Sequence, residues 1–151
     1  MINKKDAIVS THFLALLSVL LLLIAGCGKK SPGPAQPQAG ADLQGTWVGS
    51  EVDGRTGEWT FAISENQLAA TGPDKEWYKG TLSLDNKPTP MQANFAIVDC
   101  SKPDYVGKTA LGIYKLEANT LTFAASEPGA TTRPASFEAG ADVRVWVLTK
   151  Q

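Results

Sequence analysis

The stretch WTFAIS, residues 59–64, alternates large apolar side chains with small or polar ones. A period of two is the pattern of a β-strand that buries one face. The stretches TLTF, residues 120–123, and VRV, residues 143–145, repeat this alternation. No segment after residue 42 keeps a helical apolar period for three turns. The pattern therefore predicts an all-β fold for this part of the chain.

Glycine and proline interrupt residues 42–151 about every ten positions, and the segments between them are rich in β-branched and aromatic residues. Such short segments with frequent turn residues are typical of antiparallel sheets. The length of 110 residues is enough for one domain with one core. Eight strands are predicted, at residues 43–52, 57–65, 67–71, 75–84, 91–99, 108–116, 119–125 and 142–149.

The connections between these strands favour an up-and-down barrel. The link at residues 117–120 is short enough for a hairpin that pairs Leu116 with Leu121 and Tyr114 with Phe123. Antiparallel strands joined in sequence leave two open edges unless the sheet closes, and eight strands is a common closed size. A β-sandwich is the alternative, although its Greek-key links need longer connections. The one long link, residues 126–141, could cover one barrel end.

The amino terminus reads as an export signal. Lys4 and Lys5 precede an apolar run at residues 13–25, which is short of the ~20 residues that a membrane-spanning helix needs. The tetrapeptide IAGC at residues 24–27 resembles the lipobox of bacterial lipoproteins, in which the cysteine is acylated and becomes the first residue. An ordinary cleaved signal or an uncleaved anchor is the alternative to this interpretation.

The lipobox resemblance implies an exported protein with three parts. Residues 1–26 would be the signal peptide, residues 27–41 a lipidated Cys27 with a Pro/Gly/Ala-rich linker, and residues 42–151 the folded domain. The membrane would then be a partner of the chain through the acyl chains on Cys27. Gly28 follows the cysteine where similar lipoproteins of the enterobacterial inner membrane carry Asp, which favours the outer membrane, facing the periplasm.

Several kinds of chemistry are excluded by composition. The one histidine, His12, lies in the predicted signal, so histidine-based nucleophile activation and histidine-ligated metal sites have no candidate residues. We therefore expect no enzyme, no metal and no cofactor. Residues 42–151 carry 10 Lys and Arg against 14 Asp and Glu, a net charge of −4, which is unlike a nucleic-acid binder. Cys100 is predicted to be a buried thiol, and an intermolecular disulfide is the alternative.

A second resemblance concerns residues 42–151. The stretch LQGTW, residues 43–47, is similar to the Gly-x-Trp opening of lipocalins and related calycin barrels. Further stretches resemble a largely uncharacterised lipocalin-like family that is abundant in planctomycetes; they are residues 79–85, 107–114, 119–121, 128–129 and 133–134. The family often has a cysteine near position 124, where this chain has alanine.

The calycin resemblance implies a structural role at one barrel end. Gly45 and Trp47 would close that end, with the indole packed and its N–H bonded to a carbonyl. Calycins also tend to place a basic residue of the last strand against this tryptophan, and Arg144 or Lys150 could serve. As a ligand contact Trp47 is the less favoured interpretation.

A barrel of this size can be filled by side chains or can hold one small ligand. By strand alternation Tyr78, Phe95, Tyr114 and Phe123 face inwards, where they would line a pocket or form the core. The first hypothesis is a module that binds a small apolar, lipid-like ligand, which requires a cavity of at least ~300 Å³. The alternative is a filled barrel that binds an envelope protein through a loop at residues 99–108 or 126–141.

Overall fold

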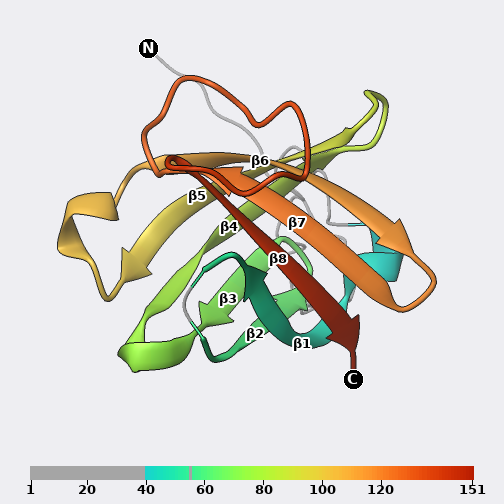
Figure 1. Cartoon of the computed structure of the whole chain (residues 1–151), viewed down its shortest axis with the longest axis horizontal. Helices are drawn as coiled ribbons and strands as arrows, with labels where there is room; N and C mark the ends of the chain where they lie inside the picture. The colour runs from blue at the N-terminus through green and yellow to red at the C-terminus, as the bar shows by residue number, and fades with distance from the viewer. Residues whose placement is uncertain (1–39, 55) are drawn as a thin grey trace, which may run out of the picture. The chain divides into compact units, whose positions relative to one another are not determined.

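A computed structural model describes residues 40–54 and 56–151 of the chain, and in it these residues form eight β-strands (Figure 1). Each strand boundary lies within two residues of its prediction. Short 3-10 turns stand at Ala41–Leu43, Pro73–Lys75 and Pro103–Tyr105. The strands are β1 (Gly45–Val52), β2 (Glu58–Ser64), β3 (Gln67–Thr71), β4 (Trp77–Asp85), β5 (Met91–Cys100), β6 (Thr109–Glu117), β7 (Thr120–Ser126) and β8 (Val143–Lys150).

The eight strands close into an up-and-down antiparallel barrel, as predicted. Every strand pairs with the next one along the chain, and β8 returns to pair with β1. The β6–β7 hairpin has the predicted register, with Leu116 opposite Leu121 and Tyr114 opposite Phe123. Because the sheet closes on itself, the β-sandwich is not the fold of this domain.

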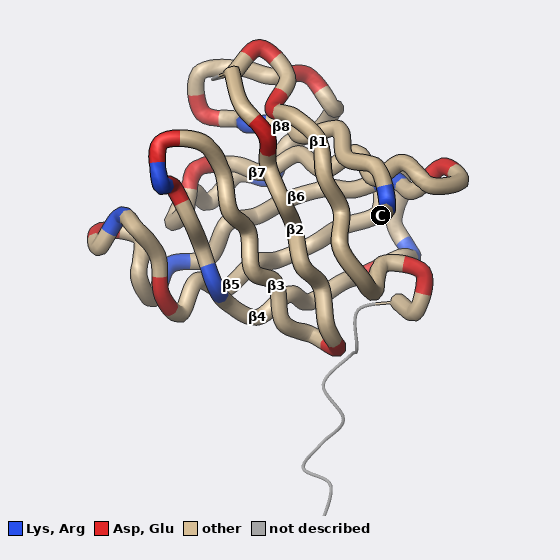
Figure 2. The backbone as a smooth tube through the Cα atoms, turned by 90° about the horizontal axis from the view of Figure 1, so that it is seen from below, with Lys and Arg blue, Asp and Glu red and all other residues tan. Residues whose placement is uncertain are grey.

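The barrel interior is filled mainly by large apolar side chains from alternate positions. Trp59, Phe61 and Ile63 of β2 point inwards and are buried, as the alternation of residues 59–64 predicts. Charged residues gather instead at the turns and strand ends, where Figure 2 shows most of the blue and red segments. The strand centres thus form one hydrophobic core that lies within residues 43–148.

Trp47 closes one end of the barrel, at the start of β1. Its indole is fully buried, and its Nε1–H donates to the carbonyl oxygen of Leu43 at 2.9 Å. Lys150 lies over this ring, with Nζ 5.2 Å from the centroid. Gly45 has φ +115°, which L-residues rarely adopt and glycine adopts freely. Of the two basic candidates of the last strand, Lys150 therefore occupies the position against Trp47.

Arg144, the other candidate, lies at the opposite end of β8. The alternation of β8 points Arg144, Trp146 and Leu148 to the interior, and Trp146 and Leu148 are buried there. Since Arg144 is six positions before Lys150 on the same strand, it cannot reach Trp47. It belongs to the open end of the barrel.

The long link between β7 and β8, residues 127–142, is here called the strap. The sequence predicts that this link could cover a barrel end, whereas its middle lies along the outer face of the sheet. Phe137 packs there against Ile113, Ala124 and Val145, three residues that stand side by side on β6, β7 and β8. An apolar row on the outer face of a sheet needs a cover, and the strap supplies it.

Arg133 fixes the strap to the sheet. Its Nη1 donates to the carbonyl oxygens of Ala93 and Gly112, and its Nη2 donates to Oδ1 of Asn94 at 2.6 Å. The ends of the strap, at residues 127–128 and 141–142, reach the open end of the barrel. The strap therefore covers the wall and contributes only its two ends to the opening.

The predictions for residues 1–39, including the signal peptide and lipidation at Cys27, lie outside the described residues. Among residues 40–54 and 56–151, no helix has the length and apolar character to cross a bilayer.

Candidate binding cavity

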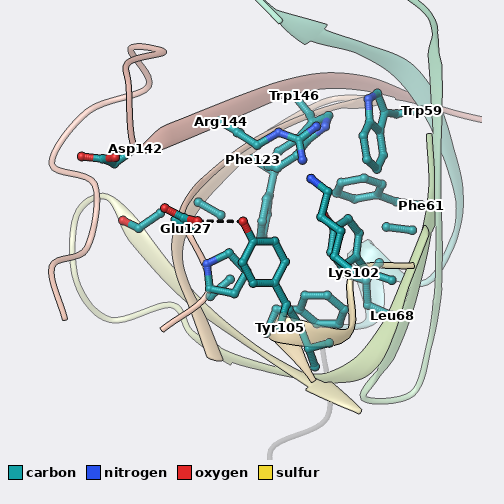
Figure 3. Close-up of a pocket in the computed structure, with 18 of the residues that line it drawn as sticks. Trp59, Phe61, Leu68, Lys102, Tyr105, Phe123, Glu127, Asp142, Arg144 and Trp146 are labelled. Atoms are coloured by element: carbon teal, nitrogen blue, oxygen red, sulfur yellow. Dashed lines mark hydrogen bonds between the residues drawn. The ribbon is translucent and has the colours of Figure 1, made fainter. Parts of the chain in front are cut away.

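A cavity of about 260 Å³ lies inside the barrel, at the end opposite Trp47 (Figure 3). Its inner wall is apolar and largely aromatic, and its mouth carries polar and charged side chains. The apolar lining includes Trp59, Phe61, Leu68, Ala70, Tyr78, Phe95, Ile97, Ala110, Phe123, Ala125 and Trp146. The mouth is formed by Lys102, Tyr105, Ser126, Glu127, Pro128, Ala141, Asp142 and Arg144.

Three of the four aromatic residues predicted for the lining are in place. Tyr78, Phe95 and Phe123 line the cavity, whereas Tyr114 does not. Tyr114 is buried in the core cluster, opposite Phe123 in the hairpin register. The β6 residue that lines the cavity is Ala110, and Tyr114 lies on the same face of the strand but four residues further along, beyond the cavity.

Two tryptophans that the sequence interpretation did not assign to a site form much of the wall. Trp59 and Trp146 meet edge to face, with centroids 5.7 Å apart and planes at 72°. Phe61 lies 5.6 Å from Trp146 and 6.0 Å from Phe123. Edge-to-face and tilted arrangements of this kind are favourable because ring edges are positive and ring faces negative.

The guanidinium of Arg144 covers this aromatic wall. Its Cζ is 5.0 Å from the centroids of both Trp59 and Trp146. Nε and Nη2 donate to the two carboxylate oxygens of Glu51, and Nη1 donates to Glu76 at 2.9 Å. Burial alone would lower the pKa of Arg144, but these hydrogen bonds and the charges of Glu51 and Glu76 raise it above its ordinary value.

Glu76 is the buried centre of the charged network. Its Oε1 accepts hydrogen bonds from Tyr78 Oη at 2.5 Å, from Lys102 Nζ at 3.1 Å and from Arg144 Nη1. Burial alone would raise the pKa of Glu76, but the hydrogen bonds from Tyr78 and Lys102 and the charge of Arg144 lower it to about 2. Burial and the bond to Glu76 raise the pKa of Tyr78. Glu76 is therefore a carboxylate at neutral pH.

The loop after β5 supplies the other side of the mouth. Lys102 reaches across to Glu76, and its amine also lies 5.6 Å from the centroid of Tyr105. Tyr105 donates its hydroxyl to Glu127 at 2.7 Å, and this hydrogen bond raises the pKa of Tyr105. Figure 3 shows the Lys102 amine pointing toward Arg144, with Glu127 and Asp142 on the other side of the mouth.

Cys100 is a buried free thiol, as predicted, and it lies at the start of this loop. Its Sγ is 2.9 Å from the carbonyl oxygen of Lys102, to which it donates. The thiol thus helps to hold the backbone of Lys102 in place. The apolar strand before Cys100 predicts that the thiol is buried. Nothing in the sequence predicts its hydrogen bond to Lys102.

The geometry limits what the cavity can hold. Its volume is below the ~300 Å³ expected for the binding hypothesis, so the cavity can hold only a ligand smaller than a drug-sized molecule. Within residues 40–54 and 56–151, no group of three His, Cys, Asp or Glu side chains is placed to hold a metal ion. No protein-family model, curated protein or solved structure matches this chain. The assignment of function therefore depends on the cavity.

Proposed function

We propose that the protein is a membrane-anchored envelope lipoprotein whose barrel binds a small apolar molecule in the cavity. The observation that carries this proposal is the aromatic wall around an open space inside an otherwise filled barrel. The wall suits an apolar body, and the polar mouth suits a single polar group at the end of that body. The lipocalin-like sequence features support ligand binding by the barrel. The lipobox-like tetrapeptide at residues 24–27 supports the membrane anchor.

Binding can be measured on the barrel alone, residues 40–151, because all eight strands and the core lie in this segment. Its cooperative thermal unfolding is checked first. The fragment is then titrated with an environment-sensitive apolar fluorophore and competed with short-chain fatty acids, alcohols and lysophospholipids. We expect saturable one-to-one binding that small competitors displace. A folded fragment without saturable binding would instead indicate a barrel that acts through its loops on an envelope protein.

A matched pair of variants locates the binding site. Ala110 lines the cavity, so Ala110→Leu places a larger side chain in the open space and should weaken probe binding at least tenfold. Ala96 lies one strand away on the exposed outer face, so Ala96→Leu makes the same chemical change outside the cavity. Equal binding by both variants would place the probe elsewhere on the molecule.

The membrane half of the proposal has its own test. A bacterial host that expresses the full chain is fed an alkyne analogue of palmitate, and incorporation is followed by click labelling. We expect labelling of the chain and its loss in Cys27→Ser. Labelling of the variant at the level of the original chain would rule out Cys27 as the acylated residue.

A further inference from the structure

We propose that the ligand carries an uncharged oxygen acceptor, such as the carbonyl of a ketone, aldehyde or ester, and that Lys102 is the residue that selects it. This inference rests on the proposed function, because it concerns the polar end of the molecule in the same cavity. It is carried by the donors at the mouth and by the balance of charge around them.

The mouth presents hydrogen-bond donors that the protein does not use up. Lys102 Nζ has three N–H groups and donates to Glu76, which leaves donors on an amine that points across the mouth (Figure 3). Arg144 uses three of its five N–H groups on Glu51 and Glu76. An acceptor at the end of an apolar ligand would therefore meet donors where it leaves the aromatic wall.

The charges around these donors disfavour an anionic ligand. Arg144 and Lys102 are already neutralised by Glu51 and Glu76. Glu127 and Asp142 also lie at the mouth, and a further cation near it in the described part of the chain is Lys108, whose Nζ is 5.7 Å from the Tyr105 centroid. A ligand carboxylate would add a fifth anionic group to four carboxylates and three cations. An uncharged oxygen accepts the same hydrogen bonds without this repulsion.

The tryptophans of the aromatic wall offer no acceptor to a ligand. The Nε1 atoms of Trp59 and Trp146 are buried, and neither has a hydrogen-bond partner in the described part of the chain. Both residues line the cavity, and both are in contact with the Arg144 guanidinium. Neither indole can accept a hydrogen bond from a ligand, because an indole N–H only donates.

Three naphthalenes of nearly equal size separate the possible head groups. 2-Acetylnaphthalene has a carbonyl where 2-ethylnaphthalene has a methylene group, and 2-naphthoate has a carboxylate. Their affinities for residues 40–151 are measured by isothermal titration and by quenching of tryptophan fluorescence. We expect the ketone to bind about 3–10-fold more tightly than the hydrocarbon, as one added hydrogen bond gives, and the carboxylate to bind more weakly than both.

Lys102→Met keeps most of the side-chain length and removes the donors. We expect the ketone to bind this variant no more tightly than the hydrocarbon. In the unchanged barrel, the infrared carbonyl band of the bound ketone should lie at lower frequency than in hexane, and the variant should reverse the shift. The control is Lys79→Met, because Lys79 contacts the Trp77 ring from an exposed position outside the cavity and should leave the ketone preference intact.

The outcomes distinguish this inference from the proposed function. If none of the three compounds binds the folded fragment, the proposed function itself fails. If ketone and hydrocarbon bind equally well, the cavity stands and the acceptor preference is overturned. Tightest binding by the naphthoate would show that the charge argument is wrong, and an unchanged ketone preference in Lys102→Met would show that Lys102 is not the selecting residue.

Discussion

Arg144 on the last strand and Glu51 on the first are joined by a two-point ion pair, although 93 positions separate them in the sequence. Nε meets Oε1 at 2.6 Å and Nη2 meets Oε2 at 2.5 Å. Two parallel charge-assisted hydrogen bonds fix the guanidinium plane relative to the carboxylate plane, and they are stronger than hydrogen bonds between neutral groups. The pair therefore holds together the two strands whose contact closes the barrel.

This ion pair should show strong coupling in a double-mutant cycle. We expect Glu51→Gln and Arg144→Met to be coupled by about 1–3 kcal/mol in the free energy of unfolding, because both groups are mostly buried. The exposed pair of Lys115 and Glu117 is the control and should be coupled by less than about 1 kcal/mol. Chemical denaturation of the four variants of each cycle gives both values, and equal coupling in the two cycles would contradict the argument.

Glu76 should make the barrel sensitive to acid. Its pKa is about 2 in the folded barrel against an ordinary value of 4.5, so its contribution to stability is complete above pH 4.5 and is lost as the pH falls toward 2. We expect Glu76→Gln to lower the free energy of unfolding by about 3 kcal/mol at pH 7 and to remove much of its decrease between pH 5 and 2. Denaturation at a series of pH values measures both effects.

The control for this pH series is Glu58→Gln, which removes an exposed carboxyl group. We expect it to change neither the stability at pH 7 nor the slope in acid. If Glu76→Gln retained the acid slope of the original chain, the network around Glu76 would not be the origin of that slope.

Trp47→Phe should destabilise the closed end of the barrel without affecting ligand binding. The change removes the donor that bonds Leu43 and part of a fully buried ring, which together should cost about 2–3 kcal/mol. Probe affinity should stay within twofold because Trp47 does not line the cavity. Trp77→Phe, at a half-buried position, should cost less than Trp47→Phe. A large loss of probe affinity in Trp47→Phe would mean that the two ends are coupled.

Cys100 should be protected from thiol reagents in the folded barrel. Its side chain is buried, so we expect labelling by Ellman's reagent to proceed only as fast as the barrel opens, and at least a hundredfold faster in denaturant. A control cysteine can be placed at Val98, which is 66% exposed on the same strand, in a Cys100→Ala background. This control should react at once. Fast native labelling of Cys100 would indicate an accessible, functional thiol.

The strap should stabilise the barrel through Phe137. Phe137→Ala removes a half-buried ring from the row formed by Ile113, Ala124 and Val145, and we expect a loss of about 1–2 kcal/mol. Binding of a hydrophobic surface dye should rise as this row becomes exposed. Ser136→Ala, at the exposed neighbouring position, is the control and should have little effect. No change in stability or dye binding would mean that the row is covered without Phe137.

The fold could be predicted because each strand carries its pattern locally. The alternation of Trp59, Phe61 and Ile63 identifies both the strand and its inner face. In β8 the alternation identifies the strand but not the face, because valines stand at one set of positions and Arg144 and Trp146 at the other. The valines face outwards, and Val145 is buried by the strap. Only the packing of a distant segment shows why an apolar row lies outside.

The site was less predictable because it combines residues from opposite ends of the chain. Tyr78, Phe95 and Phe123 follow from strand alternation, but the depth at which the cavity ends does not, so alternation alone does not show that Tyr114 belongs to the core and not to the lining. The contact of Arg144 with Trp59 depends on closure between β8 and β1. No spacing in the sequence encodes this distance. The available signal is a cation, Arg144, among the apolar residues that begin the last strand.

Closure of β8 against β1 also sets the order in which the barrel can form. The hairpins from β2 to β7 are local and can assemble early, but the β1–β8 seam joins segments about a hundred residues apart, which raises the contact order and slows folding. Until residues 143–150 are in place, β1 and β7 each keep an unpaired edge that can recruit another chain. Removing β8 should therefore yield an aggregating species rather than a smaller stable domain.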